Sequence, residues 1–305
     1  MIEREISFSK IKKNYLSFLK KQENGNKTFY DKLEQLKNFY IPICNSIYKW
    51  HRLKNKVSVI GLSGGQGSGK TTITQIIKII LRTKYKLRVI NFSIDDFYKT
   101  LNQRKKMSKK KHKLFLTRGV PGTHDMVLLK KCFNSLFKNK FKSFLIPRFD
   151  KSTDDRYPKN RWTKVKKKPD ILIFEGWCLG AKHQTDKKLN KTTNLLEKNH
   201  DKRLIWRKEV NNELKKRYKK IFKLINKLIF LEVPNFNYVY KWRLMQEKKL
   251  AKNSKGKKTM SETQVRNFIM YYERITRQML KDLKTESDIT IKIDKKHRLN
   301  HIKFN

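Results

Sequence analysis

The sequence predicts an α/β fold in which a mostly parallel sheet carries helices on both faces. Short apolar segments alternate with longer segments of helical periodicity, which is the pattern of parallel strands joined by crossover helices. The clearest pair is the apolar run Val57–Leu62, which leads into glycines, and a helical pattern from Lys70 to about Tyr85. Further strands are expected at 88–93, 143–149, 171–175, 228–233 and 289–293.

Polar segments interrupt this pattern and are expected to lie outside the core. Residues 1–55 are typical of polar helices that carry aromatic residues, with a break at Tyr40-Ile41-Pro42, and we expect an N-terminal helical extension there. Four further segments are rich in lysine or other polar residues, which favours solvated, mobile loops. These segments are 104–113, 164–168, 182–203 and 248–261, of which the last would connect two helices.

The net charge of the chain is strongly positive. Its 76 Lys and Arg residues against 26 Asp and Glu residues give a formal charge of +50. The lysines are spread along the whole chain instead of being gathered in one arm, so we do not expect nucleic-acid binding as the main role. The charge should still strengthen the binding of polyanions, ATP included, in a salt-dependent way.

Cysteine usage and hydropathy exclude several classes of protein. Cys44, Cys132 and Cys178 are far apart and form no C-x-x-C pair, which argues against a disulfide framework or a structural zinc site. No apolar run approaches the roughly 18 residues needed to cross a membrane, and the first residues lack a signal-peptide pattern. We therefore expect a cytoplasmic protein whose cysteines are small apolar residues in or near the core.

The segment 64–71 fits the phosphate-binding pattern G-x-x-x-x-G-K-[ST]. Its glycines let backbone N–H groups turn toward phosphate oxygens, and the helix that follows adds its positive N-terminal end. We expect Lys70 to contact the β- and γ-phosphates of ATP and the Thr71 hydroxyl to bind Mg²⁺. The expected nucleotide-binding set is Gly64, Gly65, Gln66, Gly67, Ser68, Gly69, Lys70, Thr71 and Thr72.

Carboxylates follow two of the expected strands, at the end where ligands bind in open α/β sheets. Asp95 and Asp96 come directly after the strand at 88–93, and Asp95 is the candidate base that orients an attacking hydroxyl and accepts its proton. Glu175 ends a later apolar strand and is a candidate Mg²⁺ ligand. An isolated Asp pair is more often a turn or helix cap, but downstream of a phosphate loop the catalytic interpretation is favoured.

The order of these segments resembles the P-loop small-molecule kinases of the uridine kinase and phosphoribulokinase group. Within that group the chain is most similar to D-glycerate 3-kinase of the plant and cyanobacterial type and its fungal relatives. The most specific block is the R-G-x-P-G-T-H-D pattern at 118–125, which generic uridine kinases lack. The segments that carry the resemblance are 64–72, 93–98, 118–125, 147–152 with 154–156, 174–180, and 233–236 leading to 242–247.

The resemblance implies transfer of the ATP γ-phosphate to the 3-hydroxyl of D-glycerate, which gives 3-phosphoglycerate in glycolate salvage (photorespiration). It also implies a P-loop kinase domain at 56–305 with a lid region at about 235–265. Arg243 on the lid helix would stabilise charge in the transition state. The substrate-binding residues expected from the matched blocks are Asp96, Tyr98, Arg118, His124, Asp125, Arg148, Asp150, Lys151 and Arg156.

An anionic acceptor is also favoured on physical grounds. The planar fork of arginine binds a carboxylate such as that of glycerate bidentately. Arg118, Arg148 and Arg156 remain arginine in a chain otherwise rich in lysine. The plainer interpretations are surface ion pairs for these arginines, a helix cap for Thr123–Asp125 and a solvated position for Arg243.

Two alternative functions stay open. A related kinase would act on another small acceptor, such as uridine, pantothenate or a sugar. A basic nucleic-acid-associated P-loop ATPase would hydrolyse ATP faster with RNA or DNA, although it gives the Asp95-Asp96 pair and the 118–125 block no task. We therefore expect ATP and glycerate as small-molecule partners, and neither a membrane nor a specific nucleic acid.

Overall fold

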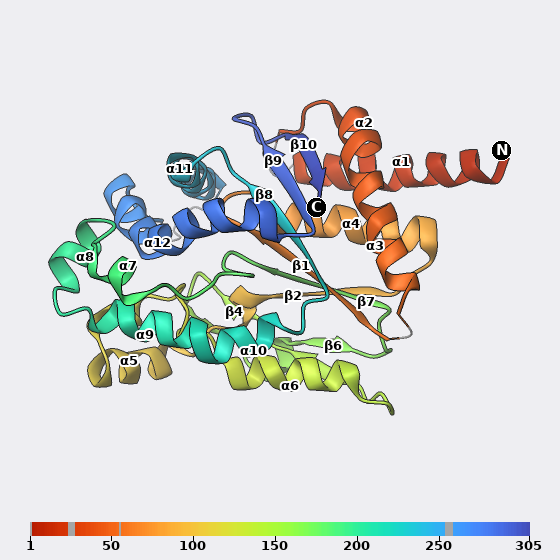
Figure 1. Ribbon diagram of the computed structural model, residues 1–305. Coiled ribbons are helices and arrows are strands. Elements are labelled where there is room, and N and C mark those ends of the chain that lie inside the picture. The colour runs from red at the N-terminus through yellow and green to blue at the C-terminus, as the bar shows by residue number, and fades with distance from the viewer. Residues whose placement is uncertain (1, 24–27, 55, 254–258) are drawn as a thin grey trace.

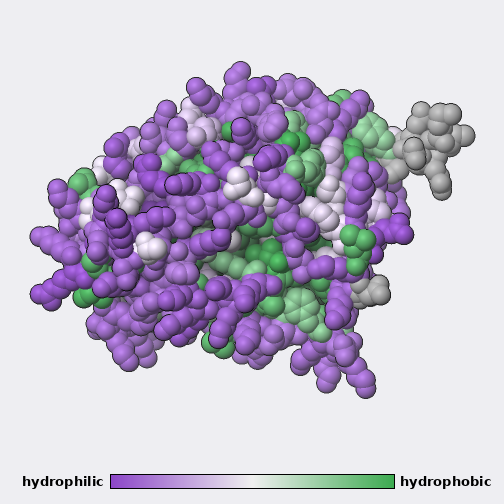
Figure 2. All heavy atoms as spheres, in the orientation of Figure 1, coloured by the Kyte–Doolittle hydropathy of each residue, from purple (hydrophilic) through white to green (hydrophobic). Residues whose placement is uncertain are grey.

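The computed structural model describes residues 2–23, 28–54, 56–253 and 259–305 (Figure 1). Figure 2 shows one face of the molecule, which is mainly hydrophilic, with apolar side chains gathered near its centre. Among the described residues, none of the helices has the length and apolar character required to span a bilayer. Cys44, Cys132 and Cys178 are buried free thiols, as the sequence predicts.

A six-stranded sheet forms the centre of the described chain, in the order β10-β9-β8-β1-β7-β2. The first five of these strands along the chain, β1, β2, β7, β8 and β9, are parallel where they pair, and β10 adds an antiparallel edge. This confirms the expected mostly parallel sheet. The strands of the sheet are β1 Ser58–Gly64, β2 Val89–Ser93, β7 Ile171–Gly176, β8 Lys227–Glu232, β9 Ile289–Ile293 and β10 Leu299–Phe304.

Helices cover both faces of this sheet (Figure 1). The alternation within β7 shows why: Ile171 and Ile173 join one buried cluster, whereas Leu172 and Phe174 join the other. Because successive strand residues point to opposite faces, a strand buried on both sides must be apolar throughout. The helices are α1 Ile2–Glu23, α2 Lys32–Gln35, α3 Ile41–Arg52, α4 Lys70–Tyr85, α5 Leu101–Lys110, α6 Met126–Phe137, α7 Asp186–Asn190, α8 Leu195–His200, α9 Ile205–Glu213, α10 Lys219–Phe222, α11 Phe236–Asn253 and α12 Glu262–Glu286.

The N-terminal helices pack onto the same face as α4. Tyr15 and Leu19 of α1 and Ile43 of α3 share a buried cluster with Ile76 of α4. The break expected at Tyr40-Ile41-Pro42 is wrong, because the chain stays helical from a π-helix at Leu36–Tyr40 into α3. The wider π-turn precedes the proline, whose ring would clash with the carbonyl four residues back in a regular α-helix.

Two of the lysine-rich segments are ordered elements, which corrects the expectation of loops. The segment 104–113 lies largely in α5, which begins with a capping box between Thr100 and Gln103. Arg104 on this helix is fully buried and donates to the Leu116 carbonyl at 2.6 Å. The lysines of α5 lie on its outer side, so the helix has a polar composition although it is anchored from within.

Small antiparallel ladders flank the sheet on the side of α6. The strand expected at 143–149 is split into β3 (Phe144–Ile146) and β4 (Phe149–Asp150), because Pro147 between them has no N–H for a ladder. The second lysine-rich segment, 164–168, begins in β6 (Thr163–Val165), which pairs with β3. Residues Asp155–Arg156 form β5, which pairs with β4.

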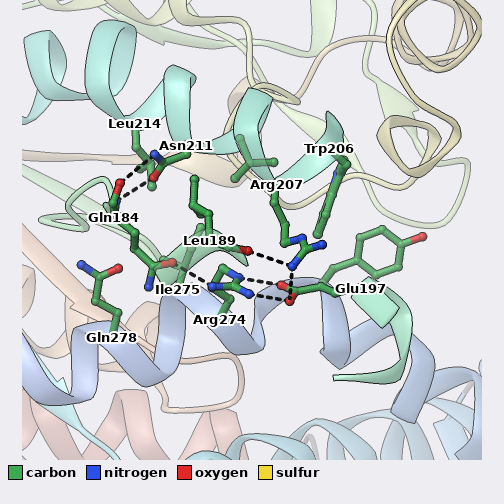
Figure 3. Close-up of a pocket in the computed structure, with 12 residues that line it drawn as sticks. Gln184, Leu189, Glu197, Trp206, Arg207, Asn211, Leu214, Arg274, Ile275 and Gln278 are labelled. Atoms are coloured by element: carbon green, nitrogen blue, oxygen red, sulfur yellow. Dashed lines mark hydrogen bonds and ion pairs between the residues drawn. The ribbon is translucent and has the colours of Figure 1, made fainter. Parts of the chain in front are cut away.

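The segment 182–203 is anchored instead of being the surface excursion that its polar composition suggests. It forms α7 and α8, which pack with α9 and α12 around a cavity of about 20 Å³, room for about one water (Figure 3). Arg274 holds the buried Glu197 carboxylate through Nε and Nη2 at 2.7 and 2.6 Å, and Arg207 lies 3.8 Å away. The charges can be buried because each faces a partner.

The connection at 248–261 lies partly outside the described residues, which omit 254–258. The described parts belong to the end of α11 and the approach to α12, so the expected pair of helices is present. Ser261 caps α12 by accepting from the Gln264 N–H at 3.3 Å.

Candidate active site

The segment 64–71 lies between the end of β1 and the start of α4. Gly67 and Gly69 have φ values of +77° and +87°, which side chains rarely adopt. The loop curls so that Lys70 Nζ donates to the carbonyls of Gly64 and Gly65 at 2.8 and 2.9 Å. Burial lowers the pKa of Lys70, and the carboxylates of Glu175 and Asp95 act against that shift.

Helix α11 and the hairpin between β9 and β10 close over this loop. A Cβ at Gly67 would lie 2.8 Å from Cβ of Trp242 on α11, so the close approach requires glycine. His297 of the hairpin meets the Gly67 carbonyl through Nε2 at 2.6 Å and stacks on Trp242, with 3.8 Å between ring centroids. No sequence signal marks His297, because it is 230 residues from Gly67.

Gln66 and Ser68 complete the loop with polar groups that face inward. The Gln66 amide and the Ser68 hydroxyl are buried and have no hydrogen-bond partner among the described residues. Buried polar groups are almost always paired in native proteins. These orphan groups mark the loop as a place where a polar ligand would supply the missing partners.

Glu175 lies beside the first turn of α4. Its two carboxylate oxygens accept from the hydroxyls of Thr71 and Thr74 at 3.1 and 3.2 Å. Burial raises the pKa of Glu175, while Lys70 and the Thr71 hydroxyl lower it. A hydroxyl and a carboxylate are oxygen donors of the kind that Mg²⁺ prefers.

The donor set around Glu175 suits Mg²⁺ better than it suits a metal ion that protein side chains alone would hold. Within the described residues there is no group of three or more His, Cys, Asp or Glu side chains that could hold a metal ion. Magnesium is usually bound by one or two carboxylates together with substrate phosphates and water. Thr71 and Glu175 are thus the residues that would hold it.

Asp95 reaches the same edge of the sheet from β2. Ser93, two residues earlier, pairs with Glu175 in the parallel ladder of β2 and β7. The Asp95 carboxylate accepts from the Tyr98 hydroxyl at 2.9 Å and from Lys151 Nζ at 2.9 Å. Burial alone would raise the pKa of Asp95, but the ammonium groups of Lys151 and Lys70 hold it well below its usual range. Asp95 is therefore ionised at neutral pH.

Asp96 is directed to a different partner. Its carboxylate accepts from the backbone N–H of Phe149 at 3.2 Å and so fastens β4 to the end of β2. Burial raises the pKa of Asp96 to about 6, and the charge of Asp95 adds to the shift. The structure therefore shifts the pKa values of the two neighbouring carboxyl groups in opposite directions.

The arginines predicted to bind substrate are mostly engaged with carboxylates of the chain. Arg118 pairs with Asp154, which also pairs with the buried Arg104. Arg156 donates to the Tyr98 carbonyl at 2.7 Å and to Asp125 at 3.2 Å. Arg148 is exposed, and its backbone carbonyl accepts from Tyr157.

The 118–125 block forms a buried turn before α6. Asp125 caps α6 by accepting from the Leu128 N–H at 3.0 Å, which is the plainer role considered from the sequence. His124 is fully buried, stacks on Tyr98 with 4.4 Å between centroids, and bonds through Nδ1 to the Tyr218 hydroxyl at 2.6 Å. Sequence reasoning missed Tyr218, which lies 94 residues away.

The remaining predicted residues lie at the rim. Asp150 accepts from the backbone and hydroxyl of Ser152 in a local turn, and Lys151 within this turn contacts Asp95. On α11, Arg243 pairs with Glu247 at 2.6 Å, so it is not the solvated arginine of the plainer interpretation. The preceding residue, Trp242, contacts the phosphate loop.

A strand–loop–helix phosphate site, with carboxylates at the ends of two neighbouring strands, defines a P-loop phosphotransferase. The sequence profile of the "Phosphoribulokinase / Uridine kinase family" matches residues 59–207. The chain is 35% identical over 223 residues to the "Uncharacterized kinase mug58" of Schizosaccharomyces pombe. The aligned segment covers 70% of this chain and 78% of that protein. The chain therefore belongs to the phosphoribulokinase / uridine kinase family and is a kinase.

A further relative carries the name of the kinase that the sequence resembles, and a solved structure supports the fold. The chloroplastic D-glycerate 3-kinase of Arabidopsis thaliana is 29% identical over 255 residues, covering 78% of this chain and 53% of that protein. The structure of the D-glycerate 3-kinase from Cryptococcus neoformans superposes with a TM-score of 0.73 at 24% identity. That match covers 91% of this chain and 100% of the fungal one, and it supports the P-loop kinase fold.

Proposed function

We propose that this chain uses ATP and Mg²⁺ to phosphorylate D-glycerate on its 3-hydroxyl, giving 3-phosphoglycerate in glycolate salvage (photorespiration). The observation that carries the proposal is the meeting of Asp95, Lys70 and Glu175 at one edge of the sheet. The relatives named D-glycerate 3-kinase support glycerate as the acceptor.

The reaction assigns one task to each side chain at this edge. The substrate hydroxyl oxygen attacks the γ-phosphorus, the bond to the ADP oxygen breaks, and the hydroxyl proton passes to Asp95. Because Asp95 is ionised and held by Tyr98 and Lys151, its main contribution is to orient the hydroxyl in line. Lys70 would leave the carbonyls of Gly64 and Gly65 and stabilise phosphate charge instead.

Thr71 and Glu175 would hold magnesium, which would supply positive charge to the phosphates of the nucleotide. The phosphates would also be bound by Gln66, Ser68, Thr72 and the loop glycines. Arg243 would reach the transition-state charge by exchanging its Glu247 partner for phosphate.

Cationic groups around Asp95 favour an anionic acceptor. The Lys151 side chain is 61% exposed at the rim, whereas Arg118 and Arg156 are only partly exposed. A small carboxylate would compete with Asp154 and Asp125 for these guanidinium groups. Uridine and neutral sugars bring no charge that would make use of them.

An acceptor panel tests the proposal. The purified chain is assayed with ATP, Mg²⁺ and, separately, D-glycerate, L-glycerate, uridine, pantothenate and sugars, with detection of ADP and of 3-phosphoglycerate. We expect D-glycerate to be the preferred acceptor and Lys70→Ala to lose about a thousandfold in rate. Strong turnover of uridine with none of glycerate would overturn the assignment of the acceptor.

A further inference from the structure

An unpaired nitrogen remains in the centre of the 118–125 block. His124 is fully buried, and its Nε2 has no hydrogen-bond partner among the described residues. Burial lowers the pKa of this imidazole to about 3, so the ring is neutral and carries a single N–H. Which nitrogen carries that proton depends on the partner of Nδ1.

The Tyr218 hydroxyl determines the tautomer. Its oxygen accepts from the Gly122 backbone N–H at 3.1 Å, which is a donor only. Its own proton needs an acceptor, and in the described part of the chain only His124 Nδ1, at 2.6 Å, is in place to accept it. With Nδ1 as acceptor, the proton of the neutral ring lies on Nε2. His124 therefore presents an unused N–H donor.

Tyr218 holds this position because of an irregular helix. It is the last residue of the π-helix Leu214–Tyr218, which joins α9 to α10. Such π-turns are rare and occur frequently at functional sites. Tyr218 is fully buried, and its ring contacts His124 edge-on with 5.8 Å between centroids.

His124 is one aromatic layer away from Asp95. Its ring stacks on Tyr98, whose hydroxyl donates to Asp95 at 2.9 Å, and the backbones of Tyr98 and His124 form a β-bridge. The unused donor thus belongs to the acceptor side of the site and not to the phosphate loop. Hydrogen bonds of a reacting complex often form only when the substrate is bound.

We propose that Tyr218 is a positioning residue, which holds His124 as the Nε2–H tautomer so that Nε2 donates to an oxygen of the acceptor substrate. The acceptor is a small hydroxy acid, and this part rests on the proposed function. The site thereby gains a donor that selects an acceptor oxygen at this position. A substrate with an N–H or a methyl group there leaves the buried donor unpaired.

The tautomer is tested by ¹⁵N NMR of the histidine rings in the full-length chain. The His124 signals are assigned among the seven histidines as those that disappear in His124→Gln. We expect an unprotonated Nδ1 and a protonated Nε2 at neutral pH, and loss of this pattern in Tyr218→Phe. A proton on Nδ1 of the unaltered protein, or an unchanged spectrum in Tyr218→Phe, overturns the proposal whatever the acceptor is.

Kinetics test the link to the acceptor. Tyr218→Phe should raise KM for D-glycerate about tenfold while KM for ATP stays within about twofold. The matched control is Tyr85→Phe, which removes a hydroxyl bonded to Asn45 at 2.6 Å at the far end of α4 and should change neither constant. Equal changes in both KM values would indicate a merely structural role and overturn the positioning. A chain with the expected tautomer that turns over another acceptor, with the KM effect falling on that acceptor, supports the positioning and overturns the proposed function.

Discussion

Individual residues at the end of β2 show how one dipeptide serves two purposes. Asp95 is ionised and paired with Lys151, whereas burial raises the pKa of Asp96 to about 6. The difference follows from their partners, since one faces an ammonium and the other a backbone N–H. A sequence pattern of two adjacent carboxylates does not distinguish these environments.

Replacing Asp95 by asparagine tests the proposed base. Asp95→Asn keeps the shape of the side chain but loses the negative charge that orients the hydroxyl and accepts its proton, so kcat with the preferred acceptor should fall about 10²–10⁴-fold. Asp170→Asn is the matched control, because Asp170 precedes β7 at the opposite end of the sheet and pairs with Arg88. Near-normal turnover of Asp95→Asn at saturating substrate would contradict the assignment.

Asp96 should make stability depend on pH. Its pKa is raised from 3.8 to about 6 in the folded chain, so the folded state binds more protons in this window and stability falls as pH rises through it. Above pH 6 the cost is about 3 kcal/mol. Asp96→Asn should match the unaltered protein in urea unfolding near pH 3.5, below the unfolded-state pKa of 3.8, and be more stable near pH 8. A difference that does not vary with pH would show that Asp96 is not shifted.

At the scale of elements, buried ion pairs help to anchor short helices that bury little apolar surface. The short helices α7 and α8 carry many polar side chains, and they are joined to α9 and α12 through Glu197, Arg207 and Arg274 (Figure 3). The cavity at this junction is lined by none of the phosphate-loop residues. We therefore assign this network to stability and not to the reaction.

Removing one charge from this network should be costly. Glu197→Gln leaves Arg207 and Arg274 without their carboxylate in a site where Glu197 is 1% exposed, so unfolding free energy should drop by about 3–5 kcal/mol. The control Glu286→Gln breaks the exposed pair with Lys182 and should cost less than about 1 kcal/mol. Equal losses in denaturant unfolding of the two variants would contradict the buried-pair account.

For the whole molecule, the charge of +50 is a distributed property. The hydrophilic face in Figure 2 agrees with lysines spread over many elements. Such a charge raises the local concentration of anions without creating a specific site.

Salt should therefore weaken nucleotide binding without changing the chemistry. Raising KCl from about 0.05 M to about 0.5 M shortens the screening length well below 10 Å, so KM for ATP should rise several-fold while kcat changes little. Steady-state kinetics at fixed free Mg²⁺ measure this. ATP hydrolysis that RNA or DNA stimulates strongly, with no acceptor present, would instead support the nucleic-acid-associated ATPase.

The sequence by itself determined the features that local patterns encode. The phosphate loop, the strands that flank it and the helix Lys70–Tyr85 follow from glycine placement and periodicity, which act over short distances along the chain. Asp95 and Glu175 could be placed at one sheet edge because parallel strands end together. The polar helix α5 was missed, since its anchoring residue, Arg104, stands at the start of a basic stretch and looks like one more surface cation.

Only the tertiary structure decided which polar groups are partners. Lys151 meets Asp95 across 56 residues, Tyr218 meets His124 across 94, and His297 meets Gly67 across 230. Such pairs depend on how helices and hairpins pack against the sheet, and no periodicity along the chain records that packing. The physical reason is that burial and neighbouring charge set the pKa and the tautomer of a side chain, and both arise only when distant segments come together.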